Sequence, residues 1–130
     1  MSRIIVSRHK GAVEFLASQM GGRIEGDAVA VYTSLDGDAL IAHREEIPVL
    51  AQASPEDVRG KVVYGNVPLS LAAEAEVVVA IEFDGQPPRG GEYTITDMRE
   101  AGAHLSRYAV LALPEDVGKR DYLAQGGFSL

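Results

Sequence analysis

The sequence predicts an α/β protein with a mostly parallel β-sheet flanked by helices. Short apolar runs rich in β-branched residues recur along the chain, and segments with helical spacing lie between them. Strands that alternate with helices in this way are joined by crossover connections, which is the pattern of a parallel sheet. The 130 residues fit a single domain, residues 1–130.

In the first half of the chain, residues 4–6 form a β-branched run that predicts a buried strand. A helix is expected over residues 11–20, ended by two glycines. Residues 28–33 predict a second strand. The hairpin signal Asp36-Gly37 follows it, so residues 39–43 are expected to pair back on that strand.

The middle of the chain contains the strongest strand. Ser54 and Pro55 begin a short helix that Gly60 ends. A strand over residues 61–64 and a short helix over residues 68–76 follow. Residues 77–83 are nearly all apolar, which predicts a central strand.

The last third is expected to hold one helix, one strand and a tail. Thr94 or Thr96 caps a helix that runs to about Ala101, and residues 108–113 predict the final strand. The tail, residues 114–130, has mixed charge. We expect it either to be mobile or to pack on a partner subunit.

Composition excludes several classes of function. The absence of cysteine excludes a disulfide framework, a thiolate metal site and a cysteine nucleophile, and it suits a cytoplasmic protein. A net charge of −7 argues against binding long nucleic acid. No apolar run approaches the roughly 20 residues that span a bilayer. No metal-ligand spacing, GxGxxG or Walker A motif is present, so neither a metal nor a cofactor is expected.

The loop after the first strand is the best candidate for chemistry. It runs from Ser7 through Arg8, His9 and Lys10 to Gly11 and leads into a helix. A helix N-terminus favours a phosphate, two cations add donors, and histidine exchanges a proton near neutral pH. The alternative is a solvated basic turn that only begins a helix.

A second loop follows the strand over residues 61–64. Gly65 permits close approach of the backbone to a ligand, Asn66 offers both donors and an acceptor, and Ser70 lies in the first turn of a helix behind Pro68. The alternative is an ordinary strand-to-helix turn, in which glycine, asparagine and proline are favoured for conformational reasons.

A few further candidates are weaker. Thr33 and Ser34 end a strand and are retained as candidate ligand contacts. Neither residue carries a pattern that separates binding from the ordinary polarity of a strand end.

Three segments together carry a family resemblance. Residues 7–16, Ser-Arg-His-Lys-Gly-Ala-Val-Glu-Phe-Leu, resemble the opening signature of the small stand-alone CRISPR-associated (Csx-type) ring nucleases of type III systems. Residues 65–73 are similar to that family's Gly-x-Leu-Pro-x-x-Leu-Ala segment. The third segment combines Arg89-Gly90, Asp97-Met98 and the residues around Tyr108. Phe15 stands where tryptophan is common in the family, and Asn66 where threonine is common.

The resemblance implies a Rossmann-like fold related to CARF domains, a homodimer and cyclic tetra-adenylate as ligand. It also implies metal-independent cleavage of that messenger by a ribose 2′-OH, which switches off antiviral signalling. Arg8, His9 and Lys10 would then be the catalytic residues, and the other loop residues would bind the ligand. Two alternatives stay open: a module that sequesters the messenger without cutting it, and an acidic interaction protein.

Overall fold

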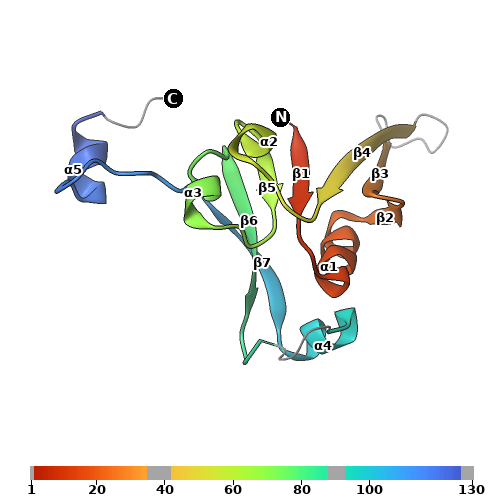
Figure 1. Cartoon of the computed structure of the whole chain (residues 1–130). Helices are drawn as coiled ribbons and strands as arrows, with labels where there is room; N and C mark the ends of the chain where they lie inside the picture. Colours follow the sequence, from red (N-terminus) through yellow and green to blue (C-terminus); the bar gives the residue numbers. More distant parts are fainter. Residues whose placement is uncertain (1, 35–41, 88–92, 127–130) are drawn as a thin grey trace.

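The computed structural model describes residues 2–34, 42–87 and 93–126 (Figure 1). The described elements are, in chain order, β1 (Arg3–Val6), α1 (Lys10–Met20), β2 (Gly22–Glu25), β3 (Ala28–Ser34), β4 (Ala42–Leu50), α2 (Pro55–Val58), β5 (Val62–Tyr64), α3 (Leu69–Ala72), β6 (Val77–Phe83), α4 (Ile95–Glu100), β7 (Ala103–Tyr108) and α5 (Lys119–Ala124). The expected α/β class is confirmed.

The strands form one mixed sheet with the order β2-β3-β4-β1-β5-β6-β7. The inner strands β4, β1, β5 and β6 are parallel. The flanking pairs β2–β3, β3–β4 and β6–β7 are antiparallel. The expectation of a mostly parallel sheet therefore holds only for the inner strands. The pairing of β3 with β4 confirms the expected hairpin, whose turn lies outside the described residues.

Two strand predictions were wrong in position. Residues 77–83 do form β6, but β1 occupies the centre of the sheet. The final strand covers residues 103–108 and not 108–113. Because β7 is an edge strand, its residues are half-buried or exposed, and it lacks the continuous apolar run by which buried strands are found.

Two further elements went beyond the expectation. Gly21 ends α1 in the left-handed conformation, and the next residue already begins β2. Strand β4 continues to Leu50, past the charged residues Arg44, Glu45 and Glu46 and past Pro48. These residues hide the strand from a search for apolar runs.

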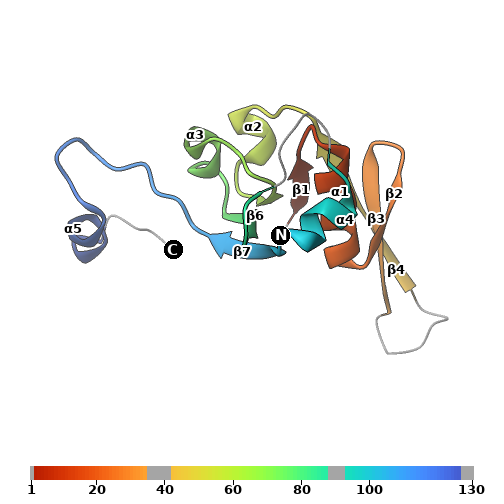
Figure 2. The same ribbon diagram turned by 90° about the horizontal axis from the view of Figure 1, so that it is seen from below.

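Helices cover both faces of the sheet (Figure 2). On one face, α1 and α4 pack their buried residues, among them Phe15, Leu16 and Met98, against Ile5, Ile47 and their neighbours. On the other face, Val58 of α2 packs with Ile4, Val6 and Val63, and Leu71 of α3 borders this cluster. Successive residues of β1 therefore serve opposite cores, as the alternation of a strand requires.

The C-terminal arm, residues 109–126, stands apart from the rest of the molecule. Both views show α5 away from the sheet at the end of an extended connection (Figures 1 and 2). No described residue beyond Tyr108 is buried, and Leu113 and Leu123 are exposed. A six-residue helix is too short to be stable in isolation. Packing against a second copy, one of the two expectations for the tail, stays a prediction.

Replacing Phe15 with alanine should lower the free energy of unfolding by about 3–5 kcal/mol, because the ring is 1% exposed and its removal leaves a cavity between α1 and the sheet. Chemical denaturation followed by circular dichroism measures this change. Leu69→Ala is the matched control: Leu69 is 76% exposed, so its removal should change stability by no more than about 0.5 kcal/mol. Equal effects of the two substitutions would contradict the assigned core.

Candidate functional site

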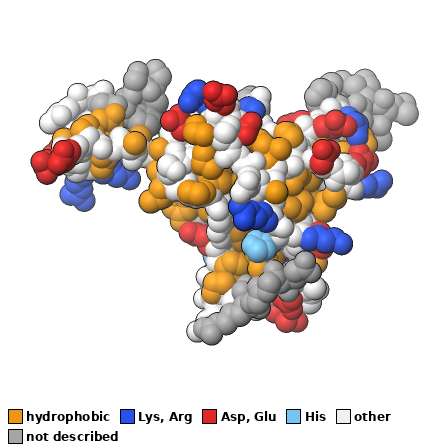
Figure 3. All heavy atoms as spheres, viewed as in Figure 1, with side chains coloured by type: hydrophobic (Ala, Val, Ile, Leu, Met, Phe, Trp, Pro, Cys, Tyr) orange, Lys and Arg blue, Asp and Glu red, His pale blue; other side chains and the backbone are white. Residues whose placement is uncertain are grey.

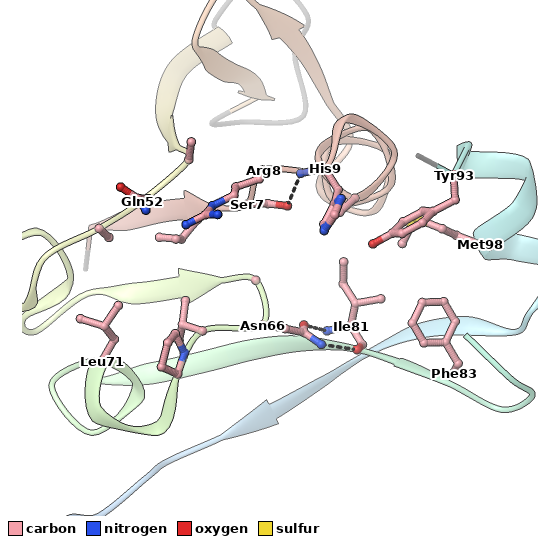
Figure 4. Close-up of a pocket in the computed structure, with 17 residues that line it drawn as sticks. Ser7, Arg8, His9, Gln52, Asn66, Leu71, Ile81, Phe83, Tyr93 and Met98 are labelled. Atoms are coloured by element: carbon pink, nitrogen blue, oxygen red, sulfur yellow. Dashed lines mark hydrogen bonds between the residues drawn. The ribbon is translucent and has the colours of Figure 1, made fainter. Parts of the chain in front are cut away.

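The carboxyl ends of the inner strands meet at one edge of the sheet. Val6 pairs with Leu50 and Ile5 with Tyr64, so β1, β4 and β5 end at nearly the same level. Tyr64 pairs with Val79 of β6, which continues past this level to Phe83. Ligands of open α/β sheets bind beyond such an edge. A pocket of about 720 Å³ lies there (Figure 4), lined by Val6, Ser7, Arg8, His9, Ala12, Ala51, Gln52, Ala53, Gly65, Asn66, Val67, Pro68, Leu71, Ile81, Phe83, Tyr93 and Met98.

The loop after β1 forms one rim of this pocket. The Ser7 amide donates to the Leu50 carbonyl oxygen at 2.9 Å, which continues the pairing of β1 with β4 past the strand end. The Ser7 hydroxyl accepts a hydrogen bond from the His9 amide at 3.2 Å. This bond holds the turn in shape, so the Ser7 side chain has a structural task besides any ligand contact.

Arg8, His9 and Lys10 are exposed and lie together at the start of α1. In Figure 3, Lys and Arg side chains flank a histidine on the face of the molecule seen in Figure 1. Arg8 and His9 line the main pocket. Lys10 does not line it, but Lys10, Gly11, Arg8 and His9 line an adjoining cavity of about 360 Å³. Lys10 forms a long ion pair with Glu14, with 4.0 Å between Nζ and Oε1.

The N-terminus of α1 has no side-chain cap. Its N-cap residue, His9, makes no side-chain capping bond, and the first turn has no acidic residue. Helices α2 and α4 differ: each begins with a complete capping box, Ser54 with Asp57 and Thr94 with Asp97. Because the first amides of a helix lack partners within it, α1 presents donors and partial positive charge where Arg8 also lies.

Gly65 brings the end of β5 against the end of β1. Its φ angle is 135°, and a Cβ atom placed on it would lie 2.1 Å from the Val6 carbonyl oxygen. The Gly65 amide donates to the Val79 carbonyl oxygen at 3.0 Å. Only glycine fits both the conformation and the space. Gly65 therefore allows the loops after β1 and β5 to pack directly against each other. This close packing explains why glycine stands at position 65, whether or not the residue also contacts a ligand.

The side chain of Asn66, for which the sequence left ligand binding and an ordinary turn as alternatives, is bonded to the backbone of β6. Its amide nitrogen donates to the Ile81 carbonyl oxygen at 3.0 Å, and its amide oxygen accepts from the Ile81 amide at 2.8 Å. The side chain thus extends the ladder between β5 and β6 by one step (Figure 4). Asn66 lines the pocket, but its oxygen and one of its two N–H groups are already engaged.

The remaining predicted site residues divide into two groups. Pro68 lines the pocket, whereas Ser70 is exposed on α3 and is not among the lining residues. Thr33 and Ser34 pair with His43 and Ala42 at the opposite end of β4. The structure describes their backbone but not their side chains. Because Ala42 lies eight residues before Leu50, this strand end is roughly 25 Å from the pocket edge.

Sequence reasoning missed three residues that shape the pocket. Gln52 follows β4, which was expected to end at His43, so its place at the carboxyl edge could not be seen. Phe83 ends β6, and Tyr93 precedes the cap of α4. The Tyr93 ring lies 5.2 Å from the His9 ring, centroid to centroid, at an interplanar angle of 31°. The position of Tyr93 directly before the capping residue Thr94 was the only sequence feature that could have indicated its place in the pocket.

A separate polar cluster lies on the outer strands and does not act on the pocket. The Tyr108 hydroxyl donates to the Glu82 carboxylate, and His104 lies 3.9 Å from the same carboxylate. Hydrogen bonds from Ser106 and Tyr108 lower the pKa of Glu82, and Glu82 in turn raises the pKa of Tyr108. Because Glu82 alternates with Ile81 and Phe83, which line the pocket, its side chain points to the other face of the sheet.

The described part of the chain contains neither a cluster of three or more potential metal ligands nor a helix with the length and apolar character to cross a membrane. The family model described as "Putative CRISPR-associated protein (Cas_VVA1548)" matches residues 4–111. This match covers β1 to β7 and both loops of the pocket. No curated protein and no solved structure matches the chain.

Replacing Asn66 with alanine should lower the free energy of unfolding by about 1 kcal/mol or more, because two hydrogen bonds to the Ile81 backbone are lost. Urea denaturation measures this loss, and the amide of Ile81 should exchange faster with deuterium. Gln52→Ala, an exposed residue of the same pocket, is the control and should leave both quantities unchanged. An unchanged stability in Asn66→Ala would show that the side chain is free for a ligand.

Proposed function

Because the chain belongs to this CRISPR-associated family, we propose that it is a ring nuclease of type III CRISPR systems that binds and cleaves cyclic tetra-adenylate. One observation carries the proposal. The uncapped N-terminus of α1, Arg8 and His9 lie on the rim of a pocket at the carboxyl edge of the sheet. Backbone amides and the guanidinium of Arg8 are therefore available to bind a phosphate, although the net charge of the chain is −7.

The pocket has a polar side and an apolar side, and this combination suits a nucleotide ligand. Ser7, Arg8, His9 and Gln52 supply polar groups on one side, and apolar side chains such as Phe83 and Met98 supply the other. A volume of about 720 Å³ suits a drug-sized ligand and is too small for a whole ring of four nucleotides. Two copies of the chain around a two-fold axis would divide such a ring between two equal pockets. The proposal therefore includes the homodimer.

The reaction that fits this equipment needs no bound cofactor. A ribose 2′-OH attacks the adjacent phosphorus while the bond to the 5′-oxygen breaks, which leaves a 2′,3′-cyclic phosphate and a free 5′-hydroxyl. The pocket holds the nucleotide in line for this attack, and that positioning lowers the barrier. Arg8, Lys10 and the α1 amides stabilise charge on the phosphoryl oxygens. His9 accepts the proton of the 2′-OH or returns one to the leaving oxygen.

Incubation of the purified protein with cyclic tetra-adenylate in EDTA, followed by chromatography of the products, tests this proposal. Linear di- or tetra-adenylate with a cyclic phosphate end is the expected result. Arg8→Ala should slow cleavage by about 100-fold or more, because a charged donor to the transition state is lost. Arg23→Ala is the matched control, since Arg23 is an exposed arginine on β2 that does not line the pocket; its rate should not change.

The other outcomes separate the alternatives. Intact ligand that co-elutes with the protein would replace cleavage by sequestration of the messenger. Neither cleavage nor binding would overturn the proposal and leave an acidic interaction protein as the better reading. Equal rates in Arg8→Ala and Arg23→Ala would remove the assigned role of the α1 loop while leaving the activity itself established.

A further inference from the structure

The pocket has one wall that the reaction at phosphorus does not use. Ile81, Phe83, Tyr93 and Met98 line its side toward α4, and Figure 4 shows the Tyr93 ring among them, facing the opening beside His9. Met98 and Ile81 are buried in the main core, whereas Tyr93 and Phe83 are only partly buried. Both aromatic rings thus line the pocket and are backed by a packed core.

The position of Tyr93 is fixed by its backbone. A Cβ atom on Gly11 would lie 2.2 Å from the Tyr93 carbonyl oxygen. The start of α1 therefore contacts the residue before the cap of α4, and this close approach is possible because Gly11 has no side chain. The next residue, Thr94, is held by its capping box with Asp97. These two contacts fix the backbone of Tyr93 beside the N-terminus of α1.

The Tyr93 ring lies next to the loop that is proposed to bind the phosphate of the ligand. The centroids of the His9 and Tyr93 rings are 5.2 Å apart, and Arg8 precedes His9 in the same loop. If Arg8 and the α1 amides bind a phosphate, the base of the same nucleotide can therefore reach the Tyr93 ring. Every nucleobase has a flat π-face that stacks on such a surface.

We propose that Tyr93 is the stacking platform for a nucleobase of the bound ligand, with Phe83 and Met98 completing an apolar base subsite. The inference rests on the proposed function, because it assigns one part of the ligand to one wall of the same pocket. Tyr93 selects ligands that carry a planar base next to the phosphate held at Arg8. Bare phosphate or a ribose phosphate gains nothing from this wall.

Titration with cyclic tetra-adenylate tests the subsite in three variants and the unaltered protein. Tyr93→Leu keeps an apolar side chain of similar bulk but removes the ring, so the dissociation constant should rise about tenfold or more. Tyr93→Phe keeps the ring and should bind like the unaltered protein. Tyr32→Leu is the control, because Tyr32 is an exposed tyrosine of β3 that does not line the pocket; its affinity should not change.

A second measurement detects the stacked base directly. In the unaltered protein, a stacked base should move the NMR signals of the Tyr93 ring protons upfield, while the ring signals of Tyr32 stay in place. Comparison with Tyr93→Phe assigns the signals.

The outcomes distinguish the subsite from the function on which it rests. Binding and cleavage that are equal in Tyr93→Leu and the unaltered protein, with no shift of the Tyr93 signals, would overturn the subsite and leave the ring nuclease standing. Absence of any binding by the unaltered protein would overturn both. Weaker binding by Tyr93→Leu together with an upfield shift would support the subsite whether or not the ligand is cleaved.

Discussion

The placement of β1 at the centre of the sheet is the constraint on which the rest of the structure depends. Its four residues pair with β4 on one side and β5 on the other, and its buried side chains alternate between two cores. A strand used in this way has no free edge and no solvated face. The chain leaves the sheet at the carboxyl end of β1, and the loop that carries Arg8 and His9 begins at that point.

The pocket follows from how closely the neighbouring strands end beside β1. Ser7 is hydrogen-bonded to Leu50, Gly65 lies against Val6, and Asn66 is hydrogen-bonded to Ile81, so the loops after β1 and β5 are both held to the backbone of neighbouring strands. On the far side, Gly11 lets the segment before α4 approach α1. Each tie is made by main chain or by a short side chain. The longer side chains of Arg8 and Gln52 are left exposed at the rim.

The sequence predicted those parts of the fold whose signals are local. The apolar runs of β1, β5 and β6, the capped starts of α2 and α4, and the loop of Arg8 and His9 were found at or near their places. Strand β7 and the second half of β4 were missed because one-sided burial and charged residues conceal them. Tyr93 was missed for another reason: its neighbour in the pocket, His9, is 84 residues away in the chain, and only the packing of α4 on α1 joins them.

The contact between Gly65 and Val6 has a consequence for how this sequence can change over evolutionary time. Any side chain at position 65 collides with main-chain atoms of β1, and no replacement of a β1 side chain can move those atoms away. A compensating second mutation is therefore not within reach, so position 65 should tolerate no drift among descendants that keep this sheet. Arg8 is under no such limit. The exposed rim is free to diverge toward new ligands while the glycine beneath it stays fixed.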